Sequence, residues 1–230
     1  MDTRGAGHPF RLDALIEAHC SVNWRQRMQR ANALLTFAKG EAIFTTGQPA
    51  ERMYMVHRGR VKVLADMGKG GTRIVRLAGD GEVLGHRALG DAPTYTASAI
   101  ALTPAHVNCI PMALFLDALK ANPLFCYHFL LHFAAEMRQL DQHLRDLMTM
   151  NVAQRVARVL LLCRDTFGMD ANDARKLAYT LPRRDVASMA DTTYESVVRS
   201  LAALQEHELI ELVGKDVLLR KPRALEKLLT

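Results

Sequence analysis

Between residues 34 and 115, apolar and polar residues alternate in short runs that glycines separate. These runs are AIFTTG, MYMVHRGRVKVLA, TRIVRLAGDG, EVLGH, YTASAIALT and HVNCI. Alternation between turn residues is typical of antiparallel strands, and glycines accept the positive φ values that tight turns need. The pattern predicts an α+β chain with an N-terminal antiparallel β-roll, a double-stranded β-helix similar to a jelly roll, at residues 34–120. A helical lead-in is expected before it, at residues 1–33.

The pattern becomes helical after Asn122 and Pro123, a pair typical of a helix cap and first turn. Neither glycine nor proline interrupts the chain from there to Met150. Apolar residues recur at alternating spacings of three and four, as in a heptad seam. The seam residues are Leu130, Phe133, Met137, Leu140, Leu144 and Leu147. We expect a long dimerisation helix at residues 121–150, with a helix that packs on its own domain as the alternative.

Residues 151–230 combine three helical segments with a short hairpin. An amphipathic helix runs up to Gly168, two closely joined helices are expected at 182–190 and 193–206, and the hairpin turns at Gly214. Val186, Met189, Val197 and Leu201 have the spacing with which two such helices bury against each other. This segment is predicted to be a winged helix-turn-helix.

Glu195 and Arg199 are four residues apart at the start of the second helix, so they share one exposed face. Arginine can donate two hydrogen bonds to guanine, and a carboxylate can accept one from cytosine N4. Thr192 or Thr193 is expected to cap this helix, with Glu195 completing a capping box. The alternative interpretation of Glu195 and Arg199 is a surface ion pair.

Composition adds little to this picture. The chain has 230 residues, 49% of them hydrophobic and 23% charged, which is typical of a globular protein. Its net charge is +6, but residues 151–230 hold 13 Lys and Arg against 11 Asp and Glu, a balance of only +2. The four cysteines form no CxxC motif, so reduced thiols and no metal site are expected. Because no apolar run approaches about 20 residues, we expect a cytoplasmic protein with no membrane partner.

From about Leu34 to Leu225 the sequence resembles the Crp/Fnr superfamily of bacterial transcription regulators. Glu195 and Arg199 match that family's Glu-x-x-x-Arg pattern, and Gly40, Gly47 and the GDGEVLG run match its β-roll. The resemblance implies a homodimer that binds double-stranded DNA, reads a palindromic operator with GA in each half-site, and contacts RNA polymerase. Tyr194 and Ser196 are further candidates for base contacts. The candidate phosphate contacts are Arg183, Ser188, Thr192 and Thr193.

The β-roll departs from the members of that family that bind cyclic nucleotides. Those members have a glutamate after the last glycine of the run and an Arg-Ser pair further on, whereas this chain has His86 and Tyr95-Thr96. A buried phosphate without an arginine is costly, so cyclic AMP is not the expected ligand. The candidate residues for another effector are Gly85, His86, Arg87, Tyr95 and Thr96, with purely structural roles as the alternative.

The cysteines and histidines of the sequence bear on two kinds of metal cofactor. An iron–sulfur cluster is not expected, because only Cys20 lies near the N-terminus. His128 and His132 are four residues apart and could bind a metal or haem, but we interpret them as packing residues.

The sequence contains no arrangement of residues typical of an enzyme, so none is expected. A ligand-binding regulatory module that acts on a protein partner is the alternative to a DNA-binding regulator. It predicts a barrel with an occupied pocket and no sequence-specific binding to DNA.

Overall fold

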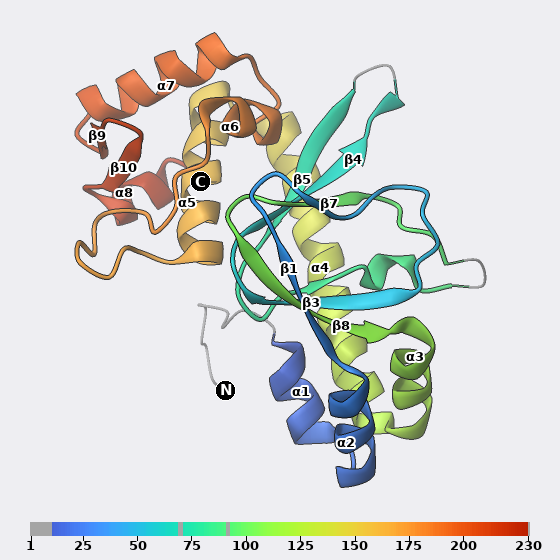
Figure 1. Ribbon diagram of the computed structural model, residues 1–230. Coiled ribbons are helices and arrows are strands. Elements are labelled where there is room, and N and C mark those ends of the chain that lie inside the picture. Colours follow the sequence, from blue (N-terminus) through green and yellow to red (C-terminus); the bar gives the residue numbers. More distant parts are fainter. Residues whose placement is uncertain (1–10, 69–70, 91–92, 230) are drawn as a thin grey trace. The chain divides into compact units, whose positions relative to one another are not determined.

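The computed structural model describes residues 11–68, 71–90 and 93–229 (Figure 1). The chain divides into two compact units, Met1–Met137 and Arg138–Thr230, and the limit between them falls within the long helix α4, Pro123–Thr149. The described residues of the first unit form eight strands in two antiparallel sheets, and the second unit is mainly helical. The predicted α+β fold class is therefore confirmed.

The β-roll of the first unit consists of two four-stranded sheets with strand orders β1-β8-β3-β6 and β2-β7-β4-β5. Their strands are β1 Ala33–Phe37, β2 Ala42–Phe44, β3 Arg52–Arg58, β4 Val61–Asp66, β5 Thr72–Ala78, β6 Val83–Leu84, β7 Ser98–Ala101 and β8 Ala105–Pro111. Val56, Val61 and Val107 are completely buried and belong to one core that both sheets share. The alternating runs of the sequence thus place one face of each strand inward.

Gly59 lies where the chain leaves β3 in one sheet and enters β4 in the other. Its φ is +135°, and a Cβ atom here would lie 2.7 Å from the Cβ of Ala105. Both the backbone conformation and the space require glycine, which explains why a glycine interrupts the apolar run at this corner.

Three short helices accompany the roll, α1 Leu12–His19, α2 Val22–Ala31 and α3 Met112–Ala121. Helices α1 and α2 lie within the segment expected to be a helical lead-in. Helix α3 was not expected, because it begins directly after β8 and no glycine separates the strand from the helix. Its buried residues are Met112, Phe115 and Ala118. Both α2 and α3 contact β8.

Helix α4 begins at Pro123 as expected, and the carbonyl oxygen of Asn122 accepts the first hydrogen bond of the helix, from Cys126 at 3.0 Å, but the Asn122 side chain bonds elsewhere. The Asn122 side chain is buried, donates from Nδ2 to the carbonyl oxygen of Ala118 at 2.8 Å, and accepts from the backbone amide of Ser21 at 3.0 Å. Asn122 therefore ties the start of α2 to the end of α3. Its polar atoms are satisfied within the core instead of at the end of α4.

The second unit contains α5 Val152–Phe167, α6 Arg183–Met189, α7 Tyr194–Glu206, the hairpin of β9 Ile210–Val213 and β10 Asp216–Leu219, and α8 Pro222–Lys227. Asn151 and Gln154 form a capping box at the start of α5. The hairpin pairs Val213 with Asp216, so Gly214 and Lys215 form a two-residue turn, and Gly214 has the positive φ of +60° that such turns need. The two joined helices and the wing agree with the sequence pattern. Within the described residues, no helix has the length and apolar character of a membrane span.

Candidate nucleic-acid interface and effector segment

The turn between α6 and α7 is built from buried apolar residues and one strained position. Val186, Met189, Val197 and Leu201 are at most 5% exposed, as their spacing predicted. Asp191, between the two helices, has a φ of +47°, a left-handed conformation that non-glycine residues rarely adopt. Surrounding contacts must therefore hold the turn in this shape.

Arg155 of α5 provides such contacts to the turn. Its guanidinium donates to the carbonyl oxygens of Ala190 at 2.8 Å and Asp191 at 3.3 Å, and to that of Met150 at 3.0 Å. These bonds come from a charged donor, which makes each stronger than a bond between neutral groups. Arg155 thus fixes the turn, and with it the start of α7, to α5.

Thr193 caps helix α7, because its hydroxyl oxygen accepts from the backbone amide of Ser196 at 3.2 Å. The capping box predicted between Thr192 and Glu195 is wrong, since the cap is one residue later than that motif requires. Glu195 is exposed and lies in the first turn of the helix. Its pKa is lowered by a hydrogen bond from its own backbone amide, by the Thr193 hydroxyl and by the charge of Arg199. An ionised carboxylate at this position also suits the positive end of the helix dipole.

Helix α7 exposes one face over its first two turns. Tyr194 is 48% exposed and Val198 is 45% exposed, and Glu195 and Arg199 are exposed beside them, while Val197 is completely buried. Arg199 donates from Nη2 to the Ser196 hydroxyl at 3.1 Å. The charge of Arg199 acts on Glu195, although no ion pair joins their side chains among the described residues, and both side chains are exposed.

The other residues predicted to contact DNA lie on the same two helices. Arg183 and Ser188 are half-buried on α6, and Thr192 is half-buried in the turn. Thr193 is exposed but its hydroxyl is engaged in the cap. The structure brings these residues into one unit with Glu195 and Arg199, as the sequence pattern requires.

The predicted dimer seam alternates between exposed and partly buried residues. Leu130, Met137 and Leu144 recur every seven residues on α4 and are 64%, 51% and 52% exposed. The intervening Phe133, Leu140 and Leu147 are half-buried. A stripe of large apolar side chains in solvent is costly and is typical of an interface.

The segment predicted to contain the effector pocket is filled by its own side chains. Tyr95 is 4% exposed, stacks on Phe44 at 4.1 Å between ring centroids, and donates from its hydroxyl to the carbonyl oxygen of Arg52 at 2.8 Å. Gly85 has a φ of +84° and passes so close to the Tyr95 ring that a Cβ atom would lie 3.1 Å from it. Thr96 is exposed.

His86 and Arg87 both contact Glu136, a residue that the sequence analysis did not single out. The His86 Nε2 atom lies 2.7 Å from Oε2 of Glu136, and Arg87 and Arg76 approach the same carboxylate at 3.3 and 3.2 Å. His86 is 1% exposed and Glu136 is 6% exposed. Buried charge of this kind is tolerated only where partners surround it.

Burial and charge fix the protonation states in this cluster. Burial lowers the pKa of His86 against the opposing pull of Glu136, and it lowers the pKa of His132 to about 4. Burial would raise the pKa of Glu136, but the hydrogen bond from His86 and the charge of Arg76 hold it well below its ordinary value. Glu136 is therefore ionised, and His86 donates to it from Nε2 as a neutral ring. The spacing of four between His132 and Glu136 on α4 was the one signal in the sequence that could have indicated this cluster.

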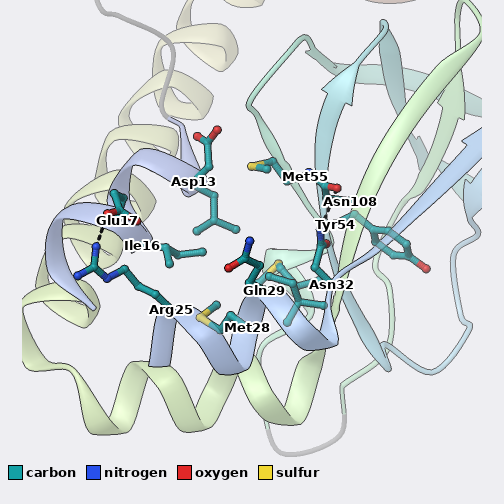
Figure 2. Close-up of a pocket in the computed structure, with 13 residues that line it drawn as sticks. Asp13, Ile16, Glu17, Arg25, Met28, Gln29, Asn32, Tyr54, Met55 and Asn108 are labelled. Carbon is teal, nitrogen blue, oxygen red and sulfur yellow. Dashed lines mark hydrogen bonds and ion pairs between the residues drawn. The ribbon is translucent and has the colours of Figure 1, made fainter. Parts of the chain in front are cut away.

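A separate cavity of about 290 Å³ lies between α1, α2 and the outer side of β3 and β8 (Figure 2). Leu12, Met28 and Met53 form buried parts of its wall, and Asn32 donates to Asn108 at 3.0 Å beside it. Figure 2 also shows the ion pair between Glu17 of α1 and Arg25 of α2. None of the predicted effector residues lines this cavity.

Comparison with known proteins places two domain families on the chain. Residues 34–122 match the cyclic nucleotide-binding domain, and residues 154–228 match the Crp-like helix-turn-helix domain. The transcriptional regulator LdrP of Thermus thermophilus is 30% identical over 193 residues, which cover 83% of this chain and 94% of that protein. The CRP-like cAMP-activated global transcriptional regulator of Mycobacterium tuberculosis is 27% identical over 195 residues, covering 83% of this chain and 85% of that protein.

A solved structure shows the same fold. FixK2 from Bradyrhizobium japonicum superimposes with a TM-score of 0.76 at 24% sequence identity, and the match covers 86% of this chain and 96% of that chain.

Proposed function

Because this chain belongs to the Crp/Fnr family of DNA-binding transcription regulators, we propose that it acts as a homodimer on a palindromic operator with GA in each half-site. The exposed Glu195 and Arg199 on the first two turns of α7 carry this proposal. The start of a recognition helix is where side chains reach base edges in the major groove.

Arg199 binds guanine through O6 and N7 in this proposal, and Glu195 accepts from a cytosine amino group. Two observations support it: each charge is available to solvent, and the cap at Thr193 and the contacts of Arg155 give α7 a fixed start. Tyr194 and Ser196 flank the pair and would contact neighbouring bases. A rigid helix that presents an exposed carboxylate and an exposed guanidinium is well suited to direct readout.

Arg183, Ser188, Thr192 and Thr193 would bind phosphates and thereby orient α7 in the groove. Such contacts strengthen binding to every DNA sequence equally, because phosphates carry no sequence information. Arg183 and Thr192 are half-buried, which supports a positioning role over a role in reading bases.

The dimer would form through α4, where Leu130, Met137 and Leu144 lie exposed on one stripe. Two copies related by a two-fold axis place their recognition helices in successive major grooves, about 34 Å apart. In this proposal residues 34–120 form the sensor, 121–150 the dimerisation helix and 151–230 the DNA-binding domain, with 1–33 as the lead-in. Contact with RNA polymerase is a further expectation from the family.

Cyclic AMP is not the effector in this proposal. Where the members that bind cyclic nucleotides have the Arg-Ser pair, this chain has Tyr95, whose ring is packed against Phe44. Where they have the glutamate, it has His86, which is already bonded to Glu136. The Mycobacterium tuberculosis relative is named as cAMP-activated, so the two proteins would differ in their ligand. The relatives are transcriptional regulators, which supports the prediction that this chain is not an enzyme.

Selection of binding sites from random DNA tests the proposal. The wild-type protein should return a two-fold symmetric motif with GA in each half. Arg199→Ala should lose about 1–3 kcal/mol of discrimination at one position of each half-site. Arg183→Ala is the matched control, because loss of a phosphate contact should weaken all sequences alike. If Arg199→Ala selects the same motif with the same discrimination, the assignment of base contacts is wrong.

A further inference from the structure

We propose that His86, His132 and Glu136 form a binding site for a divalent transition-metal ion, held between the β-roll and helix α4. The three residues each offer one ligand atom, and these atoms all lie within 4.8 Å of one another. The site lies wholly in the first unit and is independent of the DNA-binding residues.

The distances require only small movements to form a metal site. His86 Nε2 lies 2.7 Å from Oε2 of Glu136, and His132 Nε2 lies 3.6 Å from Oε1 of the same carboxylate. A tetrahedral ion with bonds of about 2.0–2.2 Å has its ligand atoms about 3.3 Å apart. His132 and Glu136 are on one face of α4 at a spacing of four, so only His86 must come from another element.

The backbone directs His86 into this site. Gly85 adopts a φ of +84°, and the short 3-10 helix that follows, His86–Ala88, carries His86 inward until its side chain is 1% exposed. Its Nδ1 atom is buried and has no hydrogen-bond partner among the described residues. The ring proton can therefore move from Nε2 to Nδ1 when a metal binds, and the only bond lost is the one that the metal replaces.

The set of two imidazoles and one carboxylate defines the class of ion. Neutral imidazole favours zinc, cobalt, nickel and copper over magnesium and calcium, and three protein ligands leave a fourth position for water or a small ligand.

The charges around the site set its affinity. Arg76 and Arg87 contact Glu136, and Arg76 also lies 3.5 Å from Glu82, so two positive and two negative groups cancel. A dication adds two charges to this balance. The Arg87 side chain is 40% exposed and can turn into solvent, while Arg76 remains beside Glu82. An anion at the fourth position would offset the remaining charge.

Cobalt(II) is the best probe, because its visible absorption reports ligand geometry. After treatment with a chelator, the full-length wild-type protein should bind one Co²⁺ ion per chain and develop the intense bands of a tetrahedral complex. His132→Gln and Glu136→Gln should each lower the affinity at least about 10-fold, since even groups that only orient a ligand contribute about 10–100-fold. His128→Gln is the matched control, because His128 lies one turn earlier on α4 and stacks on His19 instead.

Unchanged Co²⁺ binding in both His132→Gln and Glu136→Gln would overturn the proposal, as would no binding by the wild type. Near-ultraviolet circular dichroism shows whether the variants remain folded. Should either unfold, X-ray absorption of the zinc-loaded wild type decides the matter. Imidazole and oxygen neighbours are expected there, whereas a sulfur neighbour would place the ion at a cysteine and refute the site. None of these measurements involves DNA, so their outcome is separate from that of the operator experiment.

Discussion

Arg155 allows a sharp test of how the recognition helix is held, because it touches the turn but not the exposed face of α7. Arg155→Met keeps most of the aliphatic stem and removes bonds to the carbonyl oxygens of Ala190, Asp191 and Met150. The bonds to Ala190 and Met150 are part-buried, and a bond from a charged donor contributes about 1.5–3 kcal/mol. Because water can replace part of that, we expect the turn to lose about 2–4 kcal/mol of stability.

Hydrogen exchange in the full-length protein measures this loss at the turn itself. The amides of Ala190 and Thr192 bond to the carbonyl oxygens of Val186 and Ala187 at 2.9 and 3.1 Å, and they report its opening. A loss of about 2–4 kcal/mol corresponds to exchange about 30- to 700-fold faster in Arg155→Met. Arg184→Met, an exposed arginine on α6, is the control and should change little. If exchange at the turn is as slow in Arg155→Met as in the wild type, Arg155 does not hold the turn.

Two further predictions concern the long helix and the cysteines. Met137→Glu places a carboxylate in the exposed stripe of α4 and, because two such groups would face each other, should raise the dimer dissociation constant at least about 100-fold in sedimentation experiments. Gln139→Glu, on the same helix outside the seam, should leave the dimer intact, and a dimeric Met137→Glu would argue against the seam. Burial raises the pKa of Cys20 to about 11 and that of Cys163 to about 12, so iodoacetamide at about pH 8 should modify neither thiol until the protein is unfolded. Rapid modification of either thiol in the folded protein would contradict their placement in the core.

The features that the sequence predicted well are those fixed by local patterns. The alternating runs predicted the strands of the β-roll, and Gly214 marked the turn of the wing, because glycine accepts that φ more readily than other residues do. The packing of α6 against α7 was predicted from four apolar residues at fixed spacings. Their burial, at most 5% exposure, depends on helical periodicity within a short stretch of chain.

The errors at helix ends arose from competition between neighbouring polar groups. Thr192 and Thr193 can each cap a helix, and the sequence cannot show which of their hydroxyl groups lies within reach of a backbone amide. The cap is at Thr193, so the capping box predicted with Glu195 does not form. Asn122 precedes Pro123 as a cap would, but a contact with Ser21, about a hundred residues away in the chain, takes its side chain instead. Tertiary contacts of this kind are not visible in local sequence.

The cluster around Glu136 was missed for the same reason. His86 and Arg87 are separated from Glu136 by 50 and 49 positions, and only the packing of α4 against the roll brings them together. The sequence indicated His86 and Arg87 as candidates for an effector and left a structural role as the alternative. The comparisons likewise do not favour a module that acts on a protein partner, since the relatives are transcriptional regulators.

The same cluster constrains how this chain can evolve. Glu136 contacts the guanidinium groups of both Arg76 and Arg87, so its loss alone would remove this carboxylate from Arg87 and leave Arg76 with Glu82, at 3.5 Å, as its acidic contact. Breaking one partner of a buried ion pair typically costs about 3–5 kcal/mol, which is a large part of the total stability of a domain. A change of Glu136 alone is therefore disfavoured, and the residues at 76, 86, 87 and 136 should change together. An alignment of close homologues should show them as a covarying set, with loss of the glutamate accompanied by loss of an arginine.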